Sequence, residues 1–313
     1  GLLIGKDNQG LIRHQTLTDM AIIAYRGGGK TSGVLIPGII DFIHTNKLIT
    51  DIKGELVAVT ARKAIDAGRQ VFILDPFSVC KSLGVDIKTH SFNPLSYISV
   101  KDELSRDRFI SAIIAAICND EMAASSLTDV HFNESAQIIL EGLLDYYLLC
   151  GAGEQTLVGF HDFYLDLLSV KTIPEDMNTR STKSRAAYAQ LTSAGKNEAG
   201  SMKTTIYRQI QWLRSENIRK VFSKDEIDIN SFVTGDSDIY VVLPEDMVKA
   251  HSRMVRVVMG VIKAKIIGEN ARNLKPNYLF VLDELGQFGY CKDVEQAIAT
   301  LRGRGVKVWA SFQ

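Results

Sequence analysis

The amino-acid sequence predicts an α/β protein with a mainly parallel β-sheet, into which an all-helical domain is inserted. Residues 1–100 and 233–313 alternate apolar runs of strand length with helical patterns, as in parallel sheets joined by right-handed crossovers. Residues 101–232 instead carry apolar positions mainly at helical spacing. A glycine-rich loop joins the first strand of the sheet to a helix. We therefore expect the two outer blocks to form one domain that is interrupted by an all-α domain.

The first block begins with a predicted β-hairpin, formed by residues 2–5 and 11–14. Three strands of the sheet follow, at residues 20–24, 47–52 and 70–74. The helix after the first of these strands is expected to kink at Pro37, because proline removes a helical hydrogen bond. The helix after the second strand is expected to end at Gly68, since glycine readily adopts the left-handed conformation that closes a helix.

The loop after the first strand fits a phosphate-binding pattern: a small residue, four residues of any kind, then Gly-Lys-Thr. Its candidate binding residues are Ala24, Tyr25, Arg26, Gly27, Gly28, Gly29, Lys30, Thr31 and Ser32. Glycines let backbone N–H groups surround a phosphate, and the helix N-terminus adds its positive dipole end. We expect Lys30 to reach the β- and γ-phosphates of ATP and the Thr31 hydroxyl to bind Mg²⁺. The alternative is an ordinary glycine-rich turn before Lys-Thr.

Residues 101–232 show three apolar stripes at helical spacing, which are typical of core-facing helix surfaces rather than of ligand sites. The first includes Ile113 and Ile117, the second Ile138 and Leu143, and the third lies at residues 206–213. The same block contains a basic segment from 180 to 224, in which the acidic residues are only Glu198 and Glu216. Such a segment contacts nucleic acid in some proteins and is merely solvated in most. Both interpretations remain open.

The last block ends its second strand in two adjacent carboxylates. Strands at residues 238–244 and 277–282 are separated by a long amphipathic helix, and Asp283 and Glu284 follow the second strand directly. A phosphate loop needs one carboxylate beside Mg²⁺ and another that polarises the attacking water. We assign Asp283 to the metal ion and Glu284 as the catalytic base. A solvated acidic turn is the alternative.

Further polar residues lie where α/β folds place their ligands. Asp51 and Asp75 each follow a strand, although capping a helix or turn explains either equally well. Gln313 ends the last strand, at residues 306–313, where an amide could hydrogen-bond a γ-phosphate; the alternative is that it is merely the end of the fragment. Arg302 and Arg304 lie in an exposed turn, and an arginine from a neighbouring subunit can stabilise transition-state charge. A solvated loop arginine is the default for both.

Composition is that of a folded globular protein. The 313 residues are 46% hydrophobic and 23% charged. Lys plus Arg and Asp plus Glu both number 36, so a nucleic-acid partner would need a local basic surface. The cysteines have no spacing suited to metal or redox chemistry, which is typical of reduced thiols. They are Cys80, Cys118, Cys150 and Cys291.

The end of the sequence is unusual. No apolar run is long enough to span a bilayer, so we expect no membrane contact from these residues. The sequence stops inside an apolar strand at residues 306–313, and an exposed unfinished strand is an aggregation hazard. We therefore expect this sequence to be a fragment of a longer protein.

At this point the residues resemble a family, the type IV coupling proteins, which are hexameric ATPases of bacterial conjugation and type IV secretion. The stretches that carry the likeness are the phosphate loop with residues 34–37, Asp51-Ile52-Lys53-Gly54-Glu55, Leu74-Asp75-Pro76-Phe77, Phe92-Asn93-Pro94-Leu95, residues 282–289, residues 297–305, and Phe312-Gln313. The Asp-Ile-Lys-Gly-Glu and Phe-Asn-Pro-Leu strings are more distinctive than a phosphate loop. The likeness covers nearly the whole chain.

The resemblance implies a RecA-like P-loop NTPase domain that uses ATP and Mg²⁺, with an inserted all-α domain that faces the cytoplasm and meets the substrate. Arg302 would match the family's trans-acting arginine and Gln313 its γ-phosphate-sensing glutamine. The full-length protein would be a homo-hexamer at the cytoplasmic face of the bacterial inner membrane. Its partners would be type IV secretion channel components and either a DNA–relaxase complex or secreted effector proteins.

Two departures from the family pattern lie in the phosphate loop. Tyr25-Arg26-Gly27-Gly28 stands where the family often has Pro-Thr and a Ser, and Lys30-Thr31 stands where many members have Lys-Gly. The family's membrane helices and the sheet beyond Gln313 lie outside this sequence, which leaves hexamer formation by the fragment open.

Three functions follow from these observations. The first is an ATPase that drives DNA or a protein substrate to a type IV secretion channel. The second is a docking receptor, in which nucleotide only switches the conformation. The third is a chromosome-pumping DNA translocase of the same superfamily, against which the inserted helical domain argues.

Overall fold

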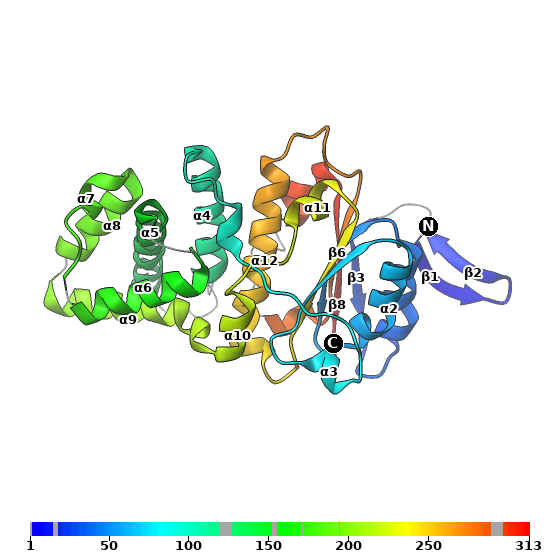
Figure 1. The fold of residues 1–313 in the computed structure, drawn as a ribbon. Coiled ribbons are helices and arrows are strands. Elements are labelled where there is room, and N and C mark those ends of the chain that lie inside the picture. Colours follow the sequence, from blue (N-terminus) through cyan, green and yellow to red (C-terminus); the bar gives the residue numbers. More distant parts are fainter. Residues whose placement is uncertain are drawn as a thin grey trace. The chain divides into compact units, whose positions relative to one another are not determined.

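Six parallel strands form one sheet in the order β3-β8-β7-β4-β6-β5 in the computed structural model of this protein (Figure 1). They are β3 (Met20–Ile23), β4 (Asn46–Asp51), β5 (Gln70–Leu74), β6 (Ser237–Val242), β7 (Tyr278–Leu282) and β8 (Val306–Phe312). The strands β4, β6 and β7 are buried along their whole length, as expected for inner strands covered on both faces. The predicted α/β fold with a mainly parallel sheet is confirmed.

The structure describes residues 2–14, 18–118, 127–151, 155–170, 172–193, 195–288 and 297–313. The chain divides into two compact units. The sheet unit comprises Gly1–His90, Glu226–Val255 and Lys265–Gln313, and the helical unit comprises Ser91–Asp225 and Arg256–Ala264. The predicted helix at residues 292–301 lies partly outside the described residues, as does Cys291.

Helices and short turns connect the strands of the sheet unit. These elements are a π-helical turn (Thr31–Leu35), α1 (Ile36–Asp41), α2 (Glu55–Asp66), α3 (Val79–Ser82), α11 (Ile229–Thr234), α12 (Val248–Gly268), and turns at Leu285–Phe288, Ala297–Leu301 and Arg302–Arg304. The middle of α12, Arg256–Ala264, belongs to the helical unit. Pro37, where a kink was expected, lies in the first turn of α1, directly after the π-helical turn, a position where a helix tolerates proline. Gly68 adopts φ +78° after α2, as predicted for a helix end.

The predicted hairpin is also present. Strands β1 (Leu2–Asp7) and β2 (Gly10–His14) pair in antiparallel fashion and project from the sheet unit (Figure 1). Asp7 accepts hydrogen bonds from the backbone N–H groups of Gln9 and Gly10, which closes the turn. Arg13 forms an ion pair with Asp41 at the end of α1.

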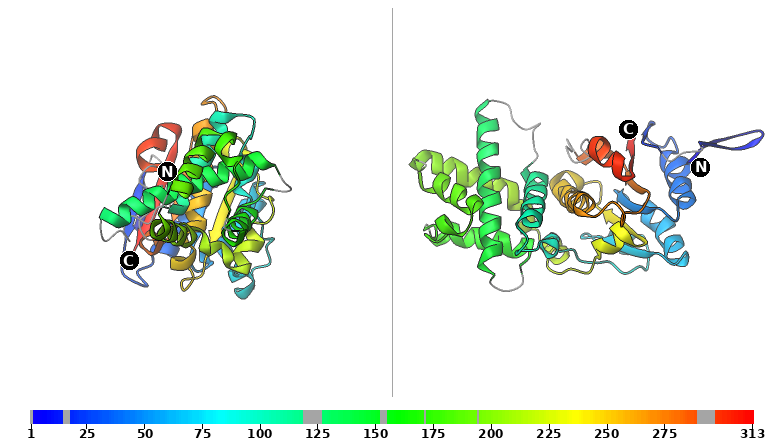
Figure 2. Two further views of the ribbon diagram at one scale, coloured as in Figure 1. Left: turned by 90° about the vertical axis from the view of Figure 1, so that its left-hand side faces the viewer. Right: turned by 90° about the horizontal axis from the view of Figure 1, so that it is seen from above.

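The helical unit is built around α5 (Leu127–Cys150), which Figure 2 shows as its longest helix. The other elements are a 3₁₀ turn (Pro94–Tyr97), α4 (Glu103–Cys118), α6 (Leu157–Val170), α7 (Met177–Arg180), α8 (Thr182–Ser193), α9 (Lys196–Ile210), a second 3₁₀ turn (Gln211–Arg214) and α10 (Glu216–Val221). Helix α8 packs closely on α5, since a Cβ at Gly142 would come within 2.4 Å of the Lys183 carbonyl.

The apolar stripes of the helical unit form its core, with one exception. Ile113, Ile117 and Leu143 are almost fully buried, as predicted. Ile138 and Ile139 were both assigned to the second stripe; Ile139 is fully buried as predicted, but Ile138 is 44% exposed. No helix among the described residues is long and apolar enough to cross a membrane. Within the same residues, Cys80, Cys118 and Cys150 form no disulfide bond.

Candidate functional site

The carboxyl ends of β3, β8 and β7 bring together the residues that the sequence singles out. The glycine-rich loop leaves β3, Gln313 follows β8, and Asp283 and Glu284 follow β7. Because β8 lies between the other two strands, Gln313 is adjacent to both the loop and the acidic pair. The backbone N–H of Ala24 donates to the Phe312 carbonyl at 3.4 Å, which fixes the start of the loop to the end of β8.

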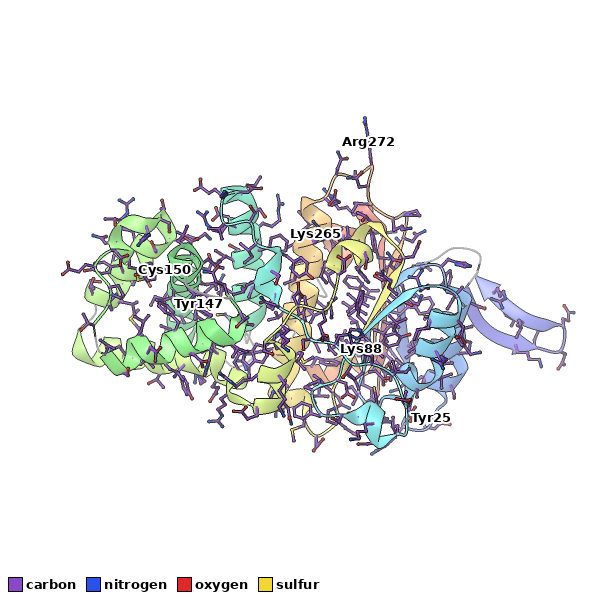
Figure 3. All side chains as sticks on the ribbon, viewed as in Figure 1. Tyr25, Lys88, Tyr147, Cys150, Lys265 and Arg272 are labelled. Atoms are coloured by element: carbon purple, nitrogen blue, oxygen red, sulfur yellow. The ribbon has the colours of Figure 1, made fainter. Side chains whose placement is uncertain are left out.

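The glycine-rich loop has the backbone that its sequence requires. Gly27 and Gly29 adopt φ +78° and +77°, a left-handed conformation that costs other residues energy, and a Cβ on either would meet open space. The Gly28 N–H donates to the Tyr25 carbonyl at 3.0 Å and closes the turn. Tyr25 itself is 80% exposed (Figure 3). Arg26 lies 4.0 Å from Glu245, a solvent-exposed pair that contributes little.

Lys30 turns inward from the loop. It is 8% exposed, and its Nζ lies 3.3 Å from Oε1 of Glu284 and 3.5 Å from the Phe312 carbonyl. Lys30 is also the last residue before the helical turn that begins at Thr31. The lysine and the acidic pair therefore meet directly, although 254 positions separate them in sequence (284 minus 30).

Glu284 is held on both of its carboxylate oxygens. Gln313 donates to Oε1, which Lys30 also contacts, and Gln287 donates to Oε2. Burial by itself raises the pKa of Glu284, but the hydrogen bonds from Gln313 and Lys30 outweigh it and bring the pKa below its ordinary value. The residue has φ +51°, an uncommon conformation for a non-glycine residue and one that clusters at functional sites. Gln287 was not identified from the sequence.

Asp283 is 5% exposed and lies between two buried hydroxyl groups. Ser311 on β8 donates to its Oδ1 at 2.7 Å, and Thr50 on β4 accepts from its backbone N–H at 3.1 Å. Burial raises the pKa of the Asp283 carboxyl, while the hydrogen bond from Ser311 opposes that shift. The sequence pattern gave no signal for Ser311 or Thr50, apart from being polar positions in otherwise apolar strands.

Asp51 and Asp75, the two other strand-end carboxylates, serve as caps. Asp51 accepts from the backbone N–H groups of Gly54 at 2.8 Å and Val57 at 2.8 Å, at the start of α2. Asp75 accepts from those of Val79 and Cys80 at the start of α3. Burial raises the pKa of Asp51 to about 6 despite these bonds. The capping alternative is thus confirmed for both aspartates.

Arg302 and Arg304 have different surroundings. Arg304 Nη1 donates to the carbonyls of Ile266 at 2.9 Å and Glu269 at 3.1 Å, where it caps the end of α12. Arg302 is exposed and has no hydrogen bond or ion pair within the described ranges. Only Arg302 is therefore available to a neighbouring molecule.

The basic segment of the helical unit contains both paired and exposed side chains. Three of its residues are tied to acidic neighbours within that unit: Arg180 to Asp176, Lys183 to Glu141, and Arg219 to Asp162. The remainder whose side chains are described are exposed: Arg185, Lys203, Arg208, Arg214, Lys220 and Lys224. Along α9 and the segment that follows it, a basic surface thus remains that carries no ion pair among the described residues.

No group of three or more His, Cys, Asp or Glu side chains is poised to hold a metal ion, as far as the chain is described. Mg²⁺ typically keeps several waters and binds to one or two protein groups plus phosphate oxygens. Thr31 and Asp283 suit that mode, since one offers a hydroxyl and the other a carboxylate beside a phosphate loop.

Comparison with known proteins gives one consistent family. The family described as "Type IV secretory system Conjugative DNA transfer" matches residues 2–313. The conjugal transfer protein TraG of Rhizobium radiobacter is 24% identical over 93% of this chain and 45% of its own length. The type IV secretion system-coupling protein VirD4 of Bartonella henselae is 23% identical over 94% of this chain and 45% of its own length. The chain thus spans about half the length of the curated relatives it matches.

Solved structures give the same fold. An unbound form of the bacterial conjugative coupling protein TrwB superposes with a TM-score of 0.67 at 15% identity, over 96% of this chain and 66% of that chain. TrwB in complex with a non-hydrolysable ATP analogue superposes with a TM-score of 0.65 at 14% identity, over 96% and 68%. The expected RecA-like P-loop NTPase fold is confirmed.

Proposed function

Because this chain belongs to the type IV secretory system conjugative DNA transfer family, we propose that it is the ATP-hydrolysing part of a coupling protein. That protein would recruit DNA or a protein substrate and drive it to a type IV secretion channel. The observation that carries the proposal is the meeting of Lys30, Glu284 and Gln313, beside Asp283, at one edge of the sheet. The relatives named as coupling proteins support the same assignment.

The glycine-rich loop fits the phosphates of ATP. Its left-handed glycines, Gly27 and Gly29, leave open space where a side chain would stand, so backbone N–H groups can approach a phosphate. Lys30 is bound to the protein through one carboxylate contact and one long contact to a carbonyl, so its ammonium group can exchange Glu284 for phosphate oxygens. TrwB structures with an ATP analogue and with ADP and Mg²⁺ support this choice of ligands.

Thr31 and Asp283 would hold Mg²⁺, which neutralises developing charge on the phosphates when it is bound. Glu284 would accept the proton of the attacking water, since a glutamate with a lowered pKa is ionised at neutral pH. Gln313 donates to Glu284, and its amide would sense a phosphate bound at the same position. Asp283→Asn is expected to weaken Mg²⁺-dependent nucleotide binding, because it removes a negative charge from the metal-binding group.

Arg302 would act in a neighbouring subunit of a homo-hexamer. It is exposed and unengaged within the described residues, whereas Arg304 is used to cap α12. An arginine supplied by a neighbour stabilises transition-state charge and is worth roughly 10³–10⁵ in turnover in known cases. Family membership further supports a position of the whole protein at the cytoplasmic face of the bacterial inner membrane.

The exposed basic surface of the helical unit would make first contact with DNA. Lys203, Arg208 and Arg214 lie on it without acidic partners among the described residues. Each lysine or arginine that neutralises a phosphate releases counterions, so affinity should fall with salt at a log–log slope of roughly −0.7 to −0.9 per contact. Changing these residues to Glu should flatten that slope and leave basal ATP turnover intact. Changing Arg180, which is paired with Asp176, provides a matched control.

The test of the proposed function is ATP turnover by the intact protein, measured with and without single- and double-stranded DNA. A motor that moves DNA should be stimulated by it. Nucleotide binding without DNA-stimulated turnover would instead favour a docking receptor. If the changed basic surface alters capture of a protein substrate but not DNA affinity, then the cargo is protein.

A further inference from the structure

The end of β7 is flanked by a buried hydroxyl on each side. Parallel pairing aligns Leu282 with Ala310 of β8 and with Thr50 of β4, so Ser311 comes to lie beside Asp283, the next residue along. Ser311 and Thr50 are both fully buried. A hydroxyl in an apolar strand is costly to bury unless it forms hydrogen bonds, and alanine or valine would fill either position without that cost. Both hydroxyls therefore call for an explanation.

The Ser311 hydroxyl forms hydrogen bonds with both acidic residues. It donates its proton to Oδ1 of Asp283 at 2.7 Å and accepts the backbone N–H of Glu284 at 2.8 Å. The first bond orients the Asp283 carboxylate. The second bond satisfies the N–H of a residue held in the left-handed region at φ +51°. A single side chain thus connects the carboxylate of one residue with the backbone conformation of the next.

Thr50 offers an internal comparison. Its hydroxyl accepts the backbone N–H of Asp283 at 3.1 Å, on the opposite side of β7, and no carboxylate bond to it is present among the described residues. Both hydroxyls thus stabilise the strand end, but only Ser311 contacts a side chain of the acidic pair.

We propose that Ser311 is a positioning residue, which through its hydroxyl sets the Asp283 carboxylate for Mg²⁺ and the Glu284 side chain for the attacking water. This inference rests on the proposed function, because it assigns Ser311 to the same site. Groups that orient metal ligands typically change metal affinity or activity about 10–100-fold when they are removed. Ser311 therefore has a role in the reaction beyond packing between β3 and β7.

The test compares Ser311→Ala with Thr50→Val in the intact protein. A fluorescent ATP analogue is titrated with and without Mg²⁺, and ATP turnover and urea unfolding are measured on the same samples. In Ser311→Ala, the Mg²⁺-dependent gain in nucleotide affinity and the turnover number should both fall about tenfold or more, while affinity without Mg²⁺ stays unchanged. In Thr50→Val, the Mg²⁺-dependent gain in affinity and the turnover number should both stay within about twofold of wild type. The loss of one buried hydrogen bond should lower the stability of this variant by an amount comparable to the loss in Ser311→Ala.

Other results would overturn the inference. If Ser311→Ala and Thr50→Val lose stability alike and change Mg²⁺-dependent affinity and turnover alike, Ser311 is only structural. If Ser311→Ala weakens nucleotide binding equally with and without Mg²⁺, it acts on the loop and not on the acidic pair. If wild-type protein binds no nucleotide, the proposed function fails, and this inference fails with it.

Discussion

Two lysine–carboxylate pairs lie at opposite ends of the parallel sheet, and their surroundings differ. Lys30 and Glu284 meet where β3 and β7 end, with 3.3 Å between Nζ and Oε1. Lys47 and Asp238 meet where β4 and β6 begin, with 3.1 Å between Nζ and Oδ2. Both pairs are removed from solvent, more completely at the second site, where both side chains are fully buried.

The pair at the strand starts is fully built into the fold. Lys47 Nζ donates to the carbonyls of Phe42 at 3.1 Å and Thr45 at 2.7 Å in addition to its contact with Asp238. Asp238 also accepts from Arg69 Nη2 at 2.9 Å and from the Lys47 backbone N–H at 3.0 Å. Arg69 Nε has no hydrogen-bond partner among the described residues, but Lys47 and Asp238 are each held by several fixed partners. This cluster therefore stabilises one arrangement of β4, β6 and the turn after α1.

At the strand ends, the lysine has fewer contacts than Lys47 has. Lys30 has one carboxylate and one carbonyl at the limit of hydrogen-bond distance, and it follows a loop of glycines. Glu284 keeps Gln287 and Gln313 as partners if Lys30 departs. The comparison indicates that Lys30 and Glu284 can change partners. Lys47 and Asp238 cannot do so without unfolding the start of β4 and β6.

The largest expected effect is on the exchangeable pair. Lys30→Ala should abolish nucleotide binding or turnover, with a loss of roughly 10²–10³ or more in rate, because a charged donor to the phosphates is removed. Its cost in unfolding free energy should be small, about 0.5–1.5 kcal/mol, since Glu284 retains other donors. Titration with a fluorescent ATP analogue and urea denaturation measure the two effects. Wild-type nucleotide affinity in this variant would contradict the assignment of the loop.

Glu284→Gln should separate binding from chemistry. Loss of a general base typically costs about 10²–10⁴ in rate, so the variant should bind ATP and hydrolyse it very slowly. The amide keeps the size of the side chain, and Asp283, the proposed metal ligand, is unchanged. Single-turnover kinetics with labelled ATP, beside equilibrium binding, make the distinction. Unchanged hydrolysis would exclude Glu284 as the base.

The structural pair should behave in the opposite way. Lys47→Met keeps the length of the side chain but removes the positive charge opposite Asp238. The unfolding free energy should therefore fall by about 3–5 kcal/mol. Nucleotide affinity of the folded protein should not change, because the site lies at the other end of the strands. Urea denaturation of Lys47→Met and Lys30→Ala, measured side by side, compares their unfolding free energies. Similar stability of the two variants would remove the distinction drawn between the two pairs.

The smallest expected effect is a pH dependence of stability. Burial lowers the pKa of Lys47 to about 8, although Asp238 opposes the shift, and lysine in the unfolded chain titrates near about 10.4. Between these values the unfolded state binds more protons, so the contribution of Lys47 to the unfolding free energy should rise with pH. The difference between wild type and Lys47→Met, measured from pH 7 to pH 10, isolates this contribution. A pH-independent difference would argue against the lowered pKa.

Much of the fold was predictable from local patterns. The strand, glycine-rich loop and helix around Lys30, the strand before Asp283 and the inserted helices all follow from hydrophobic periodicity and from residues with special backbone preferences. From the sequence, Asp51 was either a ligand residue or a cap of α2, and its hydrogen bonds to the backbone N–H groups of Gly54 and Val57 show the cap. Ile138 was misassigned, because the predicted stripe included two adjacent isoleucines and only Ile139 faces inward.

By itself, the sequence determined which elements form and which residues stand at their ends, because these depend on neighbours along the chain. The order of the strands was decided only in the tertiary structure. A buried parallel strand has the same apolar pattern at any inner position of a sheet, and its crossover connections leave the order open. Only the packed sheet places β8 between β3 and β7, so that Ser311 reaches Asp283 and Gln313 reaches Glu284. The same packing brings Lys47 to Asp238 across 191 residues, a contact that no local pattern encodes.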